Sequence, residues 1–310
     1  MRPRNVNGGS SKNPSSNVFT NRKKMKWIYE VERKDIFTIL FENYNSEQEM
    51  NKIRRLFFSP LFSAIYDFQP SVLTLEDIFE RHIFFRWKQR GYCLNCAEMR
   101  QKLNIKRPEE LHPAFKPTFD ETIISLEYFS NIIYLVRDKL DLKKMFSGSN
   151  NLNFLTENIE LLLNNLHYEK HIFKKEEKVI LAPKNPAATS VAEISSENTS
   201  FAILMYHHAS LKGKLSRKKE LLRQISQEYE PLLKKGVDGF SDYFTKARYF
   251  LNNLDIRHNN MNNSTFKDLS STDLEKLYDD LYQLLLFCVL IRDNKNRKDE
   301  MASFLNPLNK

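Results

Sequence analysis

Glycine and proline are scarce in this sequence, which has 7 glycines and 11 prolines among 310 residues. These residues punctuate folds built from many short strands and turns, so their scarcity argues against a many-stranded sandwich and favours long helices. Hydrophobic residues make up 41% of the chain and include 23 phenylalanines, enough for a sizeable core. The length allows two domains.

Cysteine is also rare, and the three cysteines, Cys93, Cys96 and Cys288, cannot form a disulfide framework. A reduced, cytoplasmic setting is therefore expected. Cys93 and Cys96 have the spacing of half a zinc site, but the sequence has no second pair to complete it. We expect structural cysteines, no metal and no cofactor.

Long apolar runs are absent. The longest uninterrupted run, 284–291, has eight residues, whereas a membrane-spanning helix needs about 20. The N-terminus also lacks the apolar segment of a signal peptide. We expect a soluble protein without a membrane partner.

Acidic residues are missing from one end of the chain. The net charge is +9, and residues 1–28 hold seven Lys or Arg and no Asp or Glu, which leaves 41 basic and 39 acidic residues elsewhere. Residues 1–24 are rich in Asn, Ser and Gly and are predicted to be a disordered basic arm on a nearly neutral body. Such an arm can hold phosphates without reading sequence, or it can be a plain solvated tail.

Helical periodicity begins at Trp27 and predicts an all-α protein with two domains. Thr74 with Asp77 is expected to start one helix, and the capping-box spacings Thr118/Glu121 and Thr272/Glu275 are expected to open two others. The expected helices include 75–90, 118–142, 201–229, 240–256 and 272–292. The predicted organisation is the arm, an N-terminal helical domain over 25–171, a linker with room for a short hairpin over 172–200, and an antiparallel helical bundle over 201–310.

The densest polar chemistry lies at 251–260, LNNLDIRHNN. Helical spacing carries the apolar rows of 240–256 onto Arg257 and His258, while Asn259 and Asn260 follow. Arginine binds phosphate through a planar fork of donors, and histidine can move a proton near neutral pH. Metal-free RNA cleavage needs both kinds of group, so we predict Arg257 and His258 as catalytic and the two asparagines as substrate-binding.

Two further histidines join this candidate site as substrate-binding residues. His208 falls on the apolar row of the helix expected over 201–229 and is predicted to face the same seam as His258, next to His207. The alternative interpretation is a polar cluster that locks the bundle and caps a helix C-terminus, where cationic side chains suit the helix dipole.

The last 110 or so residues resemble the HEPN family (higher eukaryotes and prokaryotes nucleotide-binding) of small helical bundles. Arg257 matches the arginine of the family motif, and His258 matches the polar residue after it. The motif's histidine would fall at Asn262, Asn263 or Ser264. The resemblance therefore implies either that His258 does its work from a neighbouring position or that the domain binds RNA without cutting it.

The resemblance also implies a homodimer, RNA as the partner, and a role in phage defence of the abortive-infection type. The sequence lacks the patterns GxxxxGK[ST], GxGxxG and GxSxG, which argues against P-loop and serine-hydrolase chemistry. His167 and His171 lie four residues apart, but Tyr168 stands where a HExxH zinc site has glutamate. The leading hypothesis is an RNA-directed protein, with metal-independent endoribonuclease activity as its enzymatic form. The alternative is a non-enzymatic helical sensor or adaptor that binds a protein or a nucleic acid.

Overall fold

The computed structural model describes residues 44–64, 72–112, 115–148, 150–257 and 268–305, together with residues 36, 38, 42 and 266. By contacts, the described residues from Ser46 onward belong to one compact unit. The basic arm predicted over 1–24 lies outside the described residues. The described part of the chain is mostly helical, as predicted.

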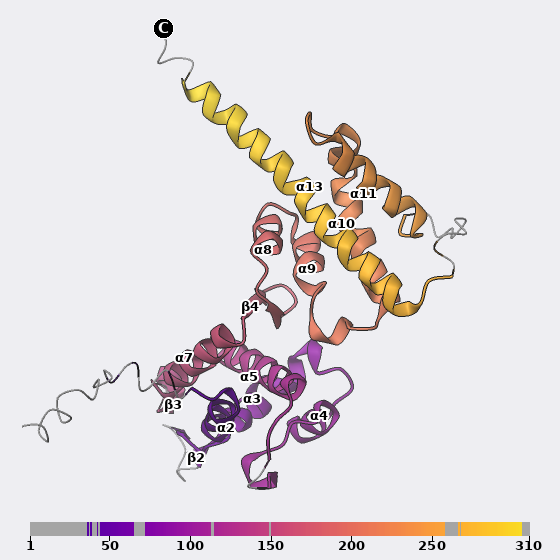
Figure 1. Cartoon of the computed structure of the whole chain (residues 1–310). Helices are drawn as coiled ribbons and strands as arrows, with labels where there is room; N and C mark the ends of the chain where they lie inside the picture. The colour runs from indigo at the N-terminus through magenta and orange to yellow at the C-terminus, as the bar shows by residue number, and fades with distance from the viewer. Residues whose placement is uncertain are drawn as a thin grey trace, which may run out of the picture. The chain divides into compact units, whose positions relative to one another are not determined.

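The first half of this unit packs around one long helix, α5 (Figure 1). The capping box predicted at Thr118 and Glu121 opens this helix. Its buried rows contact α3, α7 and β5, and Phe129 stacks on Phe57 of α2 with ring centroids 4.1 Å apart. The helices of this half are α2 (Ser46–Phe57), α3 (Leu75–His82), α4 (Cys96–Leu103), α5 (Phe119–Lys139), α6 (Leu142–Met145) and α7 (Asn150–Asn165).

The helix expected over 75–90 is shorter in the structure. The predicted helix start at Thr74 and Asp77 is confirmed, and the two residues form a capping box there, but α3 ends at His82. Two 3-10 turns follow, η3 (Phe84–Arg86) and η4 (Lys88–Arg90). The tighter turns accompany the burial of Trp87, whose ring packs edge-on against Phe79 and whose Nε1–H donates to the Glu177 carbonyl at 2.9 Å. Tertiary packing overrides the helical pattern there.

Two small antiparallel sheets refine the expected all-α fold. The first has the order β2-β1-β3, from β1 (Phe62–Ala64), β2 (Val72–Leu73) and β3 (Phe146–Ser147). The second is a hairpin of β4 (Tyr168–Phe173) and β5 (Lys178–Pro183), with Tyr168 opposite Pro183. Strands of two or three residues carry too short an alternation to be read from sequence.

Side chains of α5 complete the outer edge of β5. Asn131 accepts from the Val179 N–H and donates to the Val179 carbonyl, both at 2.8 Å. One turn earlier, Glu127 accepts from the Leu181 N–H at 2.8 Å. An edge strand must find partners for its backbone groups, and here a helix supplies them in place of another strand.

The segment 172–200, which was expected to be a linker with room for a hairpin, contains more regular secondary structure than expected. After the hairpin come α8 (Pro186–Glu193) and α9 (Glu197–Met205). Asn185 caps α8, and the small residues Ala188 and Ala192 lie buried in the C-terminal core. Small side chains suit a linker, but they also let a helix approach its neighbours closely.

The C-terminal bundle is formed by α10 (Leu215–Lys235), α11 (Ser241–Asn253) and α13 (Ser271–Leu305), with α8 and α9 packed against it. In Figure 1, α11 runs opposite to α10 and α13. The single helix expected over 201–229 is wrong, because the chain leaves the helix after Met205 and restarts at Leu215. Gly213 takes the left-handed conformation in this break, with φ of 73°.

The start of α13 also differs from expectation. Ser270 caps it, with its Oγ 2.6 Å from the Asp273 carboxylate and accepting from the Asp273 N–H. Glu275, expected to pair with Thr272, instead contacts Gly213 and Lys218. In the part of the chain that the structure describes, no helix is both long and apolar enough to cross a membrane.

Candidate functional site at the end of the C-terminal bundle

Arg257 lies beyond the end of α11 instead of on its buried row. The helix stops at Asn253, and Asp255 takes the left-handed conformation with φ of 60°. The helical register used to place Arg257 and His258 therefore ends before it reaches them. His258, Asn259 and Asn260 lie outside the described residues.

The Arg257 side chain is half-buried, and its Nη2 is shielded from solvent without a hydrogen-bond partner in the described structure. Its backbone N–H donates to the Leu251 carbonyl at 3.4 Å, which folds the turn back on α11. Next to it, Asp255 accepts from Lys219 Nζ at 2.6 Å and fixes the turn to α10. The turn thus holds an arginine whose donor capacity is only partly used.

His207 and His208 lie in the break between α9 and α10, not on a continuous helix. The His207 ring stands edge-on to Tyr206 and to Tyr282 of α13, with centroid separations of 5.2 and 4.9 Å. Burial lowers the pKa of His207, and the cation of Lys218 adds to this while Asp279 opposes it. His207 is therefore neutral at pH 7 and able to accept a proton.

His208 faces α5 and has partners on both ring nitrogens. Its Nε2 is 2.7 Å from Glu127 Oε2, and its Nδ1 is 2.7 Å from Ser210 Oγ and accepts from the Ser210 N–H. These contacts fit the tautomer with its proton on Nε2. A carboxylate, an imidazole and a hydroxyl in line can pass a proton, yet the same contacts also cap the short helix η6 (Ala209–Leu211).

A hollow of about 550 Å³ opens beside the two histidines. Its floor holds Lys218, which is 2.7 Å from Asp279 and 2.9 Å from Glu275 and lies over the Tyr206 ring. The lining also includes Lys212, Lys276 and Asp120, so the hollow has three lysines and three acidic side chains. Arg257 does not line this hollow, although its turn and the 206–214 break both lie at the end of the bundle where α10 and α13 begin (Figure 1).

His208 also borders a second hollow of about 410 Å³. This one is largely apolar, with Trp87, Met99 and Ile123 among its walls and Glu127 and Asn131 as polar groups. The break between α9 and α10 therefore separates a charged hollow from an apolar one.

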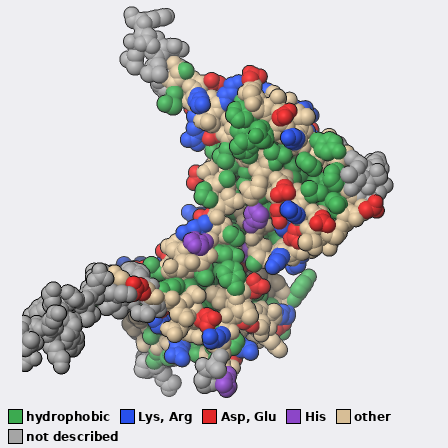
Figure 2. Space-filling model, in the orientation of Figure 1, with side chains coloured by type: hydrophobic (Ala, Val, Ile, Leu, Met, Phe, Trp, Pro, Cys, Tyr) green, Lys and Arg blue, Asp and Glu red, His purple; other side chains and the backbone are tan. Residues whose placement is uncertain are grey.

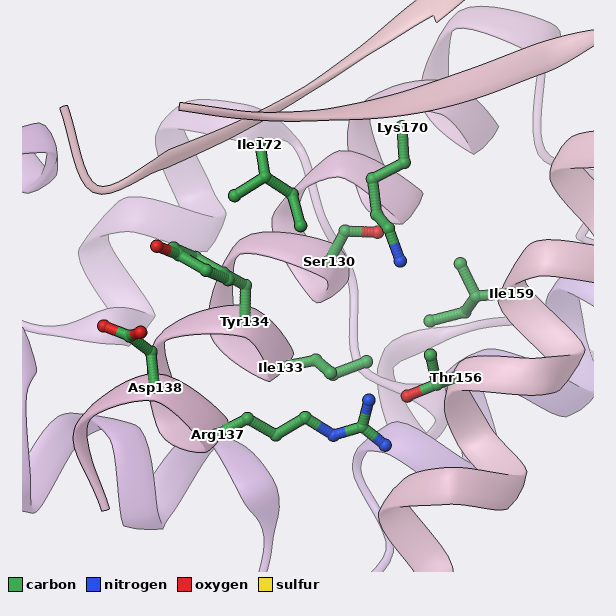
Figure 3. A pocket seen from close by; sticks show the side chains of 9 residues that line it. All are labelled: Ser130, Ile133, Tyr134, Arg137, Asp138, Thr156, Ile159, Lys170 and Ile172. Carbon is green, nitrogen blue, oxygen red and sulfur yellow. The ribbon is translucent and has the colours of Figure 1, made fainter. Parts of the chain in front are cut away.

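Figure 3 shows a third hollow, of about 290 Å³, that the sequence did not indicate. Lys170 and Ile172 enter from β4, Ser130 and Arg137 from α5, and Ile159 from α7. Ser130 Oγ is buried without a partner. Lys170 is 2.9 Å from Glu160, and Arg137 donates to Asn153 at 2.7 Å. Both cations of the hollow therefore already have a partner in the protein. The sequence signal that could have indicated this hollow is Ser130, a polar residue on the buried face of α5.

The cysteines of the half zinc pattern are both buried and unbonded. Burial raises the pKa of the Cys96 thiol, helped by Glu76 and Glu80, whose carboxylate also accepts from the Cys96 N–H. A thiol held protonated in this way is a poor metal ligand. Among the described residues, no cluster of His, Cys, Asp and Glu has the makings of a metal site.

No protein-family model, no curated protein and no solved structure matches this chain.

Proposed function

We propose that this chain is an RNA-directed protein that contacts the RNA backbone at the end of the C-terminal bundle, around Arg257. The observation that supports this is the Arg257 guanidinium, which keeps an unpartnered nitrogen beside a helix end. A phosphate oxygen is the natural acceptor for such a donor. The resemblance to HEPN bundles, and the phage-defence role that it implies, are part of the same proposal.

In its enzymatic form the proposed reaction is transesterification without metal. A base removes the proton from a 2′-hydroxyl, the oxygen attacks phosphorus, and the bond to the 5′-oxygen breaks as that oxygen takes up a proton. Arg257 stabilises the charge on the phosphorane. His258 is the proposed proton carrier, His207 is a proposed neutral substrate-binding group, and Asn259 and Asn260 are proposed to contact the substrate. His208 is the more constrained candidate because Glu127 and Ser210 hold its ring.

The test compares Arg257→Ala and His258→Ala with Arg223→Ala. Arg223 is the control because it forms an exposed ion pair with Glu220 on α10. In EDTA, each site variant should lose RNA cleavage by about 100-fold or more, since a general acid or base and a charge clamp each contribute at least that much. Helical circular dichroism should not change.

Cleavage at the wild-type rate by both variants would contradict the nuclease proposal. If the wild type binds RNA without cleaving it and Arg257→Ala loses this binding, the proposed RNA recognition is supported and the proposed enzymatic step is contradicted.

A specific surface supports binding to a protein, which both the implied homodimer and the alternative of a non-enzymatic adaptor require. Tyr243 of α11 and Phe287 of α13 are 42% and 41% exposed, and their rings pack edge-on at 5.0 Å. Phe240 extends this aromatic patch, and Figure 2 shows hydrophobic side chains gathered over these helices. Exposed aromatic groups that adjoin one another are typical of protein interfaces, and a second copy of this chain is the partner to test first.

Sedimentation equilibrium decides whether this patch associates. The double variant Tyr243→Ser, Phe287→Ser should turn a dimer into a monomer, whereas Tyr92→Ser, at a more exposed aromatic elsewhere, should not. A dimer that survives the double variant would remove the patch from the interface.

A further inference from the structure

Helix α2 carries an arginine on its buried face. Met50, Ile53, Arg54 and Phe57 follow the spacing of an apolar helical row and all lie buried. Arg54 is only 2% exposed. A guanidinium is always charged, so its burial is costly unless acceptors surround it.

The hydrogen-bond acceptors around Arg54 are too few to compensate for the burial of its charge. Nη2 donates to Ser125 Oγ over a long 3.4 Å, while Nε and Nη1 have no hydrogen-bond partner in the described structure. Burial lowers the pKa of Arg54, and Glu121 opposes this only as a nearby charge. The Glu121 carboxylate is already used by Thr118 and Asn104.

The arginine lines a cavity of about 70 Å³. Its other lining residues come from α2 and from the segment 108–115, and none of them is acidic: they are Asn51, Arg55, Pro108, Leu111, His112 and Phe115. Asn51 Oδ1 is buried without a partner as well. Arg54 and Lys106 both lie over the Phe115 ring, at 5.6 and 5.7 Å, so positive charge gathers here without a lining carboxylate.

The size of the cavity restricts what can fill it. One water occupies about 30 Å³ in the liquid, and drug-sized ligands need roughly 300 Å³ or more. A volume of about 70 Å³ suits one small polyatomic group. A tetrahedral oxoanion presents several acceptor oxygens to Nε and Nη1, and a protonated oxygen of the same group can donate to Asn51 Oδ1.

We propose that the cavity beside Arg54 is a binding site for a phosphate group, either as the free ion or as the terminal phosphate of a small ester. The phosphate completes the hydrogen bonds of Arg54 and neutralises its charge. Arg55 adds a second cation to the lining. A carboxylate carries a single charge and fewer oxygens, so it leaves more of these groups unsatisfied.

The test measures the melting temperature of the full chain at constant ionic strength with inorganic phosphate, phenyl phosphate or sodium acetate. For the wild type, phosphate should raise Tm by about 2–4 °C at tenfold its Kd. Phenyl phosphate matches this if the site takes an ester, and fails to do so if it takes the free ion. Acetate should have little effect, and an equal effect of acetate would overturn the assignment to phosphate.

Two variants assign the effect to Arg54. Arg54→Met keeps the length and apolar stem of the side chain and should abolish the rise, whereas the surface control Arg223→Met should retain it. Arg54→Lys keeps the charge but not the planar fork, and should weaken phosphate binding about tenfold. A wild-type response in either Arg54 variant would overturn the proposal.

Phosphorus NMR of the wild type provides a measurement that needs no variant. Millimolar phosphate should broaden or shift on addition of the protein, and an unchanged line with no rise in Tm would overturn the proposal. RNA cleavage by Arg54→Met should equal that of the wild type, so this site and the one around Arg257 fail or succeed separately.

Discussion

Glu76 and Arg54 are both charged residues that are 2% exposed, yet their surroundings differ completely. Around Glu76, Arg107 Nη2 lies at 2.6 Å, Arg100 Nε at 3.0 Å, and Tyr128 donates its hydroxyl at 2.6 Å. Around Arg54, the described residues provide one long contact, to Ser125 Oγ, and the ring of Phe115. The same half of the molecule thus contains one buried charge with partners and one without.

This difference separates two uses of a buried charge. The Glu76 cluster joins α3 to α4, α5 and the segment after α4. Its buried carboxylate has two arginines and a tyrosine hydroxyl within 3.0 Å, which is typical of a structural network, although Arg100 Nε and Arg107 Nε lack a hydrogen bond of good geometry in the described structure. Arg54 carries the cost of burial without the compensating partners, which is expected where an external ligand supplies them. The contrast gives a basis for predicting which substitutions unfold the protein and which only change binding.

The largest expected effect comes from breaking the network. Glu76→Gln keeps the shape of the side chain but leaves Arg100 and Arg107 without their shared counter-charge. Because removing one partner strands the others in a buried site, we expect a loss of about 3–5 kcal/mol in the free energy of unfolding. Urea denaturation measures this.

The matched control is Glu98→Gln, since Glu98 pairs with Lys102 in an exposed i, i+4 ion pair. Its denaturation midpoint should not move. If Glu76→Gln were as stable as this control, the two kinds of buried charge would not differ in the way proposed.

A smaller loss of stability is expected at acidic pH, because two histidines are buried without adequate counter-charges. Burial lowers the pKa of both His207 and His171, so the folded state binds fewer protons than the unfolded state once the pH falls below about 6.5. Stability should be constant above that pH and should fall progressively below it. Denaturation at neutral pH and at mildly acidic pH, above the range where carboxylates titrate, isolates this effect.

His207→Phe tests this assignment because phenylalanine keeps the edge-on contacts with Tyr206 and Tyr282. The fall in stability on acidification should become shallower, while His82→Gln, at an exposed histidine, should leave it unchanged. An identical pH dependence in His207→Phe and in the wild type would show that this histidine is not the source.

The smallest expected effect on stability is that of Arg54→Met. Replacing an unpaired buried cation by an apolar side chain of similar length removes a desolvation cost, so the free energy of unfolding should change by less than about 1 kcal/mol, or should increase. Urea denaturation in phosphate-free buffer measures this. A loss as large as that of Glu76→Gln would mean that Arg54 has structural partners like those of the network.

Local signals in the sequence predicted the local structure well. The capping boxes at Thr74 and Thr118 both form, because a side-chain oxygen and a carboxylate three residues apart satisfy helix N–H groups whatever surrounds them. The overall helical character also followed from the scarcity of glycine and proline. Arg54 was not predicted as a site residue, although it stands at a buried spacing on the apolar row of α2.

The helical rows used to predict that His208 faces Arg257 and His258 end before they reach these residues, because α9 ends at Met205 and α11 ends at Asn253. Apolar periodicity over 201–229 continued through the break because α9 and α10 both bury side chains in one core, so the pattern could not reveal where the helix ends. The contact of His208 with Glu127 spans 81 positions in the chain, and no local pattern contains such a pairing.

By itself, the sequence determined that the fold is mostly helical, where two of the helices start, and that polar residues are concentrated around Arg257. These properties depend on side chains within one or two helical turns of each other. Only the tertiary structure decided which charges are paired. The arginines that contact Glu76 and the glutamate that contacts His208 come from segments distant in sequence. The scarcity of acceptors around Arg54 also depends on such segments, because burial and hydrogen bonding are properties of the packed chain.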